Sequence, residues 1–245
     1  MKSGALSPTL TVNNSPRTSG FLGLLFLSQT LLNDIRGNVH SKNGEQMEKT
    51  LNITGYKCPA LYYTASGIPI VFLHGLSYSA DIWQRIGVTD LLMKKRVPFL
   101  ALNMPYGLKS QCQPKTRDPQ KNIAFVNEAV INFFGSAAPV LVGASIGGNM
   151  ALRYAARFPV KGLLLVAPAR ALEPDLVQRY SQFKFSTTIV WGSEDNIVAS
   201  EDMRTLADKV PNAKLVVYDG ANHSAYKDEP DRFKHDLLEL YANAE

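Results

Sequence analysis

The 245 residues are enough to bury a full hydrophobic core without disulfides or metals, and a composition of 45% hydrophobic and 19% charged residues is typical of one globular α/β domain. The formal net charge is +5, but the basic residues are scattered. The densest basic run, residues 94–96, falls at the end of an expected helix, where cations favour the helix dipole. Basic residues do not interleave with aromatic ones, so we expect no nucleic-acid partner.

Residues 1–46 differ in composition from the rest of the chain. The first 20 are rich in Ser, Thr, Asn, Pro and Gly, which favours a segment unable to bury a core. Residues 21–32 are apolar but too short for a spanning helix, which needs about 20 residues, so we expect no transmembrane span. Their length also fits the apolar part of a signal peptide or an interfacial helix. We expect a poorly ordered or dispensable extension over 1–46 and a folded domain over 47–245, with Met47 as a hypothetical functional start.

Two cysteines, Cys58 and Cys112, lack the C-x-x-C spacing of metal sites. The sequence disfavours a structural disulfide between them, and disfavours metal binding more strongly. No cofactor motif is present, and we expect neither a cofactor nor a metal.

Three N-x-S/T sequons occur, at Asn13, Asn52 and Asn222. A glycan on Asn222 would obstruct the neighbouring His223, a candidate catalytic residue introduced below. This favours a compartment without N-glycosylation, so we expect the cytoplasm. The alternative is a secreted or membrane-associated protein, through residues 21–32.

From residue 51 onward, strand patterns and helix patterns alternate. Apolar runs predict strands at 61–65 (as an edge strand), 68–73, 97–102, 139–144, 162–166, 187–191 and 213–218. Helical spacing predicts helices at 80–95, 118–134, 146–156, 199–210 and 229–243, with a short one near 174–182. Expected helix caps are Ser79, Asp118 and Ser200. Buried strands separated by crossover helices predict an α/β fold with a doubly wound, mostly parallel sheet.

One sharp turn joins a buried strand directly to a helix. Its sequence is Gly143-Ala144-Ser145-Ile146-Gly147, the G-x-S-x-G pattern of a nucleophile elbow. Such a turn holds the serine at a strained, often positive φ, and a Cβ on the flanking glycines would clash. The helix that starts at Ile146 would direct its N-terminal N–H groups toward an oxyanion beside Ser145.

Two further candidates follow later strands. Asp195 comes after the strand at 187–191, and His223 comes after the strand at 213–218. Functional groups of open parallel sheets gather at the carboxyl ends of the strands, so Ser145, Asp195 and His223 are expected at one edge. Asp195 could instead cap the helix at 199–210, although Ser200 fits that cap better, and Glu194 is the other candidate acid. His223 could be an ordinary loop residue.

These motifs together resemble the α/β-hydrolase superfamily, over about residues 51–243. The resemblance rests on His74-Gly75, Gly143-Ala-Ser145-Ile-Gly147, Gly192-Ser-Glu-Asp195 with Val198 after it, and Gly220-Ala-Asn-His223. The chain is most similar to small members without a lid, because only residues 167–186 occupy the place where many relatives insert a helical cap. The resemblance implies an α/β-hydrolase sheet without a cap domain and a largely open site.

The resemblance also implies a role for each matching residue. Ser145 is the expected nucleophile, His223 its general base and later acid, and Asp195 the group that orients the imidazole. The backbone N–H groups of Leu76 and Ile146 are the expected oxyanion hole.

The remaining histidines and one loop carry weaker expectations. We expect the ring of His74 to pack under the oxyanion loop, and His235 to be solvated. Superfamily relatives usually carry Asp-x-Pro-Gly-x-Gly-x-Ser where this chain has residues 103–110, beginning with Asn103, which is expected to keep the loop's local hydrogen bonds. Tyr106 and Lys109 could line the mouth of the site, where a cation would favour an anionic substrate; equally, Lys109 could be solvated.

The expected function is therefore a serine hydrolase that cleaves small-molecule carboxylic esters or thioesters through an acyl-enzyme. Acyl transfer, perhydrolysis, amide cleavage and C–C hydrolysis would use the same residues and stay open. The alternative from a different class is a binding or interaction protein that keeps the fold with little turnover. The natural substrate, its acyl-chain length and the oligomeric state are left open by the sequence.

Overall fold

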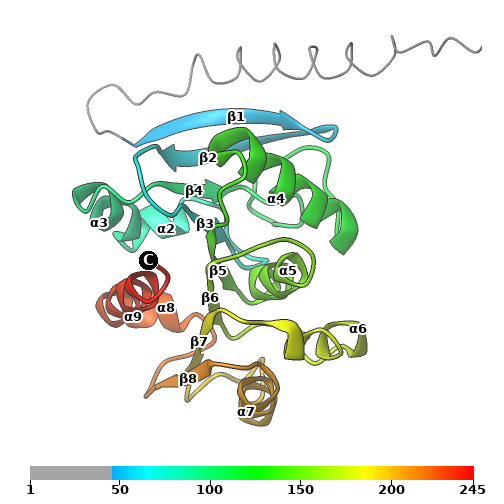
Figure 1. Ribbon diagram of the computed structural model, residues 1–245, viewed down its shortest axis with the longest axis vertical. Helices are drawn as coiled ribbons and strands as arrows, with labels where there is room; N and C mark the ends of the chain where they lie inside the picture. The colour runs from blue at the N-terminus through cyan, green and yellow to red at the C-terminus, as the bar shows by residue number, and fades with distance from the viewer. Residues whose placement is uncertain (1–45) are drawn as a thin grey trace, which may run out of the picture. The chain divides into compact units, whose positions relative to one another are not determined.

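The computed structural model describes residues 46–245, which form an eight-stranded sheet with helices on both faces (Figure 1). The expectations for residues 1–45, including the segment 21–32 and the sequon at Asn13, lie outside the described residues. The strands lie in the order β1-β2-β4-β3-β5-β6-β7-β8. Their bounds are β1 (Met47–Ile53), β2 (Tyr56–Tyr63), β3 (Ile70–Leu73), β4 (Phe99–Leu102), β5 (Val140–Ala144), β6 (Gly162–Val166), β7 (Ser186–Gly192) and β8 (Ala213–Tyr218).

The sheet is parallel from β4 to β8, and β1 and β2 extend it in antiparallel pairing. Every residue of β3, β4, β5 and β6 is buried. Strands covered by helices on both faces are apolar along their whole length, which is why these short segments lack polar alternation. The doubly wound, mostly parallel sheet expected from the sequence is confirmed.

A strand does form near residues 61–65, but the expectation that it lies at the edge of the sheet is wrong. This segment belongs to β2, which lies between β1 and β4, and β1 is the true edge. A two-residue turn, Thr54-Gly55, joins the hairpin, and both residues have positive φ (51° and 81°), the combination that matches the twist of antiparallel strands. The sequence after Met47 is strand-like, but it does not give bounds for β1, because the first half of this strand alternates with charged residues and is mostly exposed, as an edge strand is.

The helices of residues 46–245 lie on both faces of the sheet. Their bounds are α2 (Ile82–Arg85), α3 (Val88–Lys94), α4 (Pro119–Phe134), α5 (Ile146–Ala155), α6 (Pro174–Val177), α7 (Ser200–Lys209), α8 (Ala225–Asp228) and α9 (Pro230–Ala242). In Figure 1, α4, α5, α6 and α7 lie on one side of the sheet and α2, α3, α8 and α9 on the other. Between β6 and β7 the chain forms only α6 and a short 3-10 turn, so the described part of the chain has no cap domain. Over residues 46–245, no helix is both long and apolar enough to cross a bilayer.

Two of the three expected helix caps are wrong, and one is confirmed. The helix expected at 80–95 is split into α2 and α3 by Gly87, whose φ of 74° interrupts the helical backbone. Ser79 donates its hydroxyl hydrogen bond to Asp81 rather than to the helix backbone, and Ser200 makes no capping bond. Asp118 does cap α4, since its carboxylate accepts the N–H groups of the next residues at 2.8 and 3.3 Å.

The two cysteines form a disulfide, which corrects the sequence-based expectation. Cys58 lies on β2, and the segment after β4 folds back beside it. There Lys57 and Gln113 exchange two backbone hydrogen bonds, of 2.6 and 2.9 Å, which place Cys112 against Cys58. The expectation of two unpaired cysteines was wrong because their contact depends on the path of a loop. The spacing of the two cysteines in the sequence does not indicate that path.

Candidate active site

Ser145 stands at the turn between β5 and α5 with φ 53°, in the left-handed region expected for a nucleophile elbow. Its backbone is fixed from both sides. The N–H of Ser145 donates to Val166 O at 2.8 Å, and its carbonyl accepts the N–H of Ala169 at 3.1 Å. The hydroxyl has no hydrogen-bond partner within residues 46–245, so the turn presents an unoccupied Oγ at the carboxyl edge of the sheet.

The glycines around Ser145 are required by close backbone packing. A Cβ on Gly143 would lie 2.5 Å from Gly147 O, and a Cβ on Gly147 would lie 2.7 Å from His74 O. Gly148 would meet Pro168 at 2.8 Å. Real Cβ atoms do not approach other atoms so closely, so the G-x-S-x-G pattern reflects the packing of β5, α5 and β3 at this corner.

Asp195 and His223 are brought together at the ends of β7 and β8. Their side chains meet at 2.8 Å between His223 Nδ1 and Asp195 Oδ2. The other oxygen, Oδ1, accepts the backbone N–H groups of Ile197 and Val198, at 2.8 and 3.0 Å. Asp195 therefore does not cap α7. It is also the acid that contacts His223, whereas Glu194 is exposed.

Nε2 of His223 has no hydrogen-bond partner within residues 46–245. Nδ1 donates to a carboxylate that is fully buried and held by two N–H groups, and this fixes the ring and its tautomer. The loops themselves are locked, since the N–H of Glu194 donates to Ala221 O at 2.9 Å. A side chain on Gly192 would collide with the same backbone.

The backbone N–H groups of Leu76 and Ile146 are both unpaired in the described part of the chain. Ile146 is the first residue of α5, where an N–H group has no partner within the helix. Leu76 follows His74-Gly75 at the end of β3. Both residues line the same cavity as Ser145.

His74 holds the loop that carries Leu76. Its ring is fully buried; Nε2 accepts the N–H of Met104 at 2.9 Å, and Nδ1 therefore carries the proton and donates to Gly75 O at 2.8 Å. The hydroxyl of Tyr106 donates to His74 O at 2.6 Å. Burial lowers the pKa of His74 to about 4, so the ring stays neutral. The expected structural role of His74 is confirmed.

Two cavities meet at Ser145 and Leu76. The larger, of about 420 Å³, lies between α4, α5 and the loop after β6, and Ile146 and Met150 form part of its wall. The smaller, of about 70 Å³, is lined by His223 and by the loop at residues 75–78. Ser145 and His223 share this smaller cavity, although the described atoms form no direct hydrogen bond between them.

The expectations for the loop at 103–110 are only partly right. Tyr106 lines the larger cavity, but it is buried. Lys109 is exposed and lines a separate cavity beside Asn103 that does not include Ser145. Asn103 accepts the N–H of Ala80 at 3.3 Å, so it ties this loop to the chain before α2 rather than closing a local turn.

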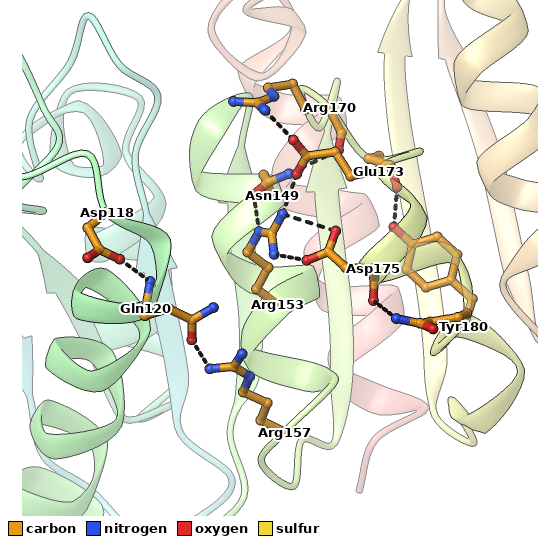
Figure 2. Close-up of polar contacts among 11 residues, drawn as sticks. Asp118, Gln120, Asn149, Arg153, Arg157, Arg170, Glu173, Asp175 and Tyr180 are labelled. Atoms are coloured by element: carbon orange, nitrogen blue, oxygen red, sulfur yellow. Dashed lines mark hydrogen bonds and ion pairs between the residues drawn. The ribbon is translucent and has the colours of Figure 1, made fainter.

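The sequence did not identify a charged network beside the larger cavity. Figure 2 shows the Arg153 guanidinium between the carboxylates of Glu173 and Asp175. Its Nε donates to Asn149 Oδ1 at 2.9 Å, and Arg170 pairs with the remaining oxygen of Glu173. The hydrogen bond from Arg153 lowers the pKa of Asp175. This network fixes the loop after β6 to α5; its only sequence signal is that the loop follows a strand next to β5.

Other polar groups lie near the site or apart from it. Tyr226 lines the smaller cavity, and its hydroxyl has no partner among the described residues. On α9, His235, Asp236 and Glu239 lie close enough to share an ion, but none of them lines either cavity. The His235 side chain is 77% exposed, which confirms that it is solvated.

Comparisons with known proteins agree with this fold. A family model described as "Alpha/beta hydrolase family" matches residues 70–187. "Protein ABHD14A" of Danio rerio is 27% identical over 177 residues, which cover 71% of this chain and 64% of the relative. Human ABHD14B, named "Putative protein-lysine deacylase ABHD14B", is 26% identical over 210 residues, which cover 80% of this chain and 95% of the relative.

Solved structures resemble the chain in fold. The "predicted CIB-like hydrolase" of Thermoplasma acidophilum superposes with a TM-score of 0.72 and 21% identity, covering 80% of this chain and 97% of its own. The chain thus spans about two-thirds of the length of its ABHD14A relatives (64%) and nearly all of this shorter structure. With its sheet order, its serine turn and these matches, the chain has the α/β-hydrolase fold and is similar to members of the α/β-hydrolase family.

Proposed function

We propose that the protein is a serine hydrolase that cleaves carboxylic esters or thioesters through an acyl-enzyme. The observation that carries this proposal is that His223, which is paired with the buried Asp195, lines the same cavity as Ser145. A binding protein that needs only the fold has no use for a buried carboxylate aimed at a loop imidazole. The two unpaired N–H groups of Leu76 and Ile146 support the same interpretation.

The first half of the reaction follows from this geometry. Nε2 of His223 accepts the proton of Ser145 Oγ as the oxygen attacks the carbonyl carbon of the substrate. The negative oxygen of the tetrahedral intermediate is stabilised by the N–H groups of Leu76 and Ile146; one such donor contributes about 3–4 kcal/mol in comparable sites. His223 then returns the proton to the leaving alcohol or thiol, and Ser145 keeps the acyl group.

The second half repeats these steps with water as the nucleophile. His223 takes a proton from the water, which attacks the acyl-enzyme, and the same N–H groups stabilise the second intermediate. Asp195 stabilises the imidazolium in both halves. His223 then returns the proton to Ser145 Oγ as the second intermediate breaks down. The products are a carboxylic acid and free Ser145, and no cofactor or metal enters this sequence.

A second candidate function is the removal of acyl groups from amines. The name of the ABHD14B relative refers to a protein-lysine deacylase, and amide cleavage would use the same nucleophile and base with an amine as the leaving group. Acyl transfer differs only in the acceptor that replaces water. A panel of acyl esters, thioesters and acyl-lysine peptides distinguishes these outcomes.

A fluorophosphonate probe tests the proposal directly. We expect covalent labelling of the wild-type chain and none of Ser145→Ala, because the probe reacts with an activated serine. Ser193→Ala is the matched control: it is exposed and lies outside both cavities, and it should be labelled like the wild type. Labelling that survives in Ser145→Ala, or no labelling of the folded wild type, contradicts the proposal.

The domain division and the compartment can be tested with the same assay. Residues 1–46 are proposed to be dispensable, and a chain starting at Met47 should then fold and react with the probe as the full chain does. Of the two compartments expected from the sequence, the Cys58–Cys112 disulfide supports the secreted or membrane-associated one, because the cytosol keeps thiols reduced. Thiol counting on protein from its native cells decides between them.

A further inference from the structure

The two cavities at Ser145 separate the two parts of a substrate. The departing oxygen, sulfur or nitrogen must reach Nε2 of His223, which lines only the smaller cavity. The acyl chain then extends to the other side of the serine, into the cavity of about 420 Å³. That volume is in the usual range for small-molecule sites.

The wall of this larger cavity is rich in arginine. Arg117, Arg153 and Arg170 line it, and Glu173 is the single acidic residue in the lining. The carboxylate of Glu173 is already shared, since one oxygen pairs with Arg153 and the other with Arg170. The cavity therefore carries a positive charge that its own acid does not neutralise.

The three arginines differ in how free they are. Arg153 is nearly buried and is saturated by Asn149, Glu173 and Asp175, so it acts as a fixed support (Figure 2). The other two are exposed.

Arg170 makes one ion pair, which leaves most of its five N–H donors available. Arg117 lines the same cavity from the loop just before α4, and its guanidinium makes no ion pair or hydrogen bond within residues 46–245.

Part of the lining of the larger cavity is apolar. Leu76, Ile146 and Met150 line it, together with Ala169 from the opposite loop. A ligand that suits this arrangement has an apolar stem next to the reacting carbonyl and an anionic end between Arg117 and Arg170. Arginine recognises carboxylates through paired N–H donors, and so matches such an end.

We propose that the preferred acyl group carries a terminal carboxylate, as in half-esters or half-thioesters of short dicarboxylic acids. This inference rests on the proposed hydrolase function. It assigns Arg117 and Arg170 as specificity residues that bind the free carboxylate, while Ser145 and His223 act on the other end of the acyl chain.

A matched pair of esters tests the inference. The mono-p-nitrophenyl ester of glutaric acid and the p-nitrophenyl ester of pentanoic acid have the same leaving group and the same chain length. They differ only in a terminal carboxylate or methyl. We expect the wild type to show at least about tenfold higher kcat/KM for the glutarate ester, after subtraction of the background measured with Ser145→Ala.

Variants of the two arginines should change this ratio selectively. Arg117→Gln should lower kcat/KM for the glutarate ester by about fivefold, with a much smaller change for the pentanoate ester. Arg170→Gln, which also loses the ion pair with Glu173, should lower the ratio of the two kcat/KM values by about fivefold. Arg157→Gln is the control, because its guanidinium bonds Gln120 outside the larger cavity. The preference should also weaken in 1 M salt, which screens exposed charges.

The outcomes separate this inference from the function on which it rests. Equal rates for the two esters, or a ratio unchanged in both arginine variants, overturn the anionic acyl group while probe labelling of Ser145 still supports a hydrolase. Absence of both labelling and ester hydrolysis overturns both. Calorimetric binding of monomethyl glutarate to Ser145→Ala gives a readout without turnover, and binding that is lost in the added Arg117→Gln change supports the assignment.

Discussion

Acidification from pH 7 to pH 5 should destabilise this protein through one buried ring, His74. The neutral ring is required by its two hydrogen bonds, because Nε2 accepts the N–H of Met104 and cannot do so when protonated. Burial lowers the pKa of His74 from its ordinary 6.5 to about 4. The unfolded chain, which has no such burial, takes up the proton at the ordinary value.

The sign and size of the effect follow from this difference. Between pH 6.5 and pH 4 the unfolded state binds one more proton than the folded state, so the free energy of unfolding decreases as the pH falls. The full fall of the pKa corresponds to about 3 kcal/mol, since a factor of ten in proton affinity is worth about 1.4 kcal/mol. About 2 kcal/mol of this should be lost by pH 5, and the contribution is complete above the ordinary pKa.

Urea unfolding at pH 7 and pH 5 measures this difference. His74→Gln should be less stable at pH 7 but should lose about 2 kcal/mol less between the two pH values. His235→Gln, whose side chain is exposed, should keep the wild-type dependence. If His74→Gln does not fold, the NMR titration of the wild-type ring still decides, with no protonation expected above pH 5. A wild type equally stable at both pH values, or a His74→Gln variant that keeps the full dependence, refutes the reasoning.

Three further predictions follow. Asp195→Asn should lower kcat on a p-nitrophenyl ester by about 10⁴-fold while the circular dichroism spectrum is unchanged, because the imidazole loses the anion that orients it; a loss below tenfold contradicts its role. Replacing Cys58 and Cys112 by Ala should lower the free energy of unfolding by about 2–4 kcal/mol, as a cross-link over a separation of 54 residues is lost, and a reductant should destabilise only the wild type. Gly147→Ala, whose Cβ would meet the end of β3, should cost about 3 kcal/mol or more in urea unfolding, and a wild-type midpoint would contradict the packing described.

The parts of the fold that the sequence predicted are those set by local patterns. The buried runs at β3, β5 and β6 are apolar throughout, and the Asp118-Pro119 start of α4 is a strong helix signal, so their places were right within a few residues. The split between α2 and α3 was missed because Gly87 sits inside an otherwise continuous helical pattern. The sequence did not give the bounds of the edge strand β1. Its first half lacks the apolar residues that mark a strand, and its pairing with β2 holds it in the sheet.

The candidate site divides in the same way. Ser145, Asp195 and His223 could be found because each follows a strand, and the carboxyl ends of parallel strands share one edge. Arg117 and Arg170 could not, since they lie in loops without a motif and become neighbours of one cavity only when the loops after β4 and β6 fold toward α5. The sequence did not predict the Cys58–Cys112 disulfide for the same reason. Such contacts depend on the tertiary path of the loops, and the spacing of residues along the chain does not predict them.

The location of β8 at the far edge of the sheet affects the order in which a newly made molecule becomes reactive. This strand pairs only with β7, and the imidazole that meets Asp195 follows it. The serine corner, both N–H donors and the walls of the larger cavity all leave the ribosome earlier. On the proposed mechanism, a polypeptide that ends before β8 lacks the general base, so it cannot activate Ser145 whatever else of the chain is present.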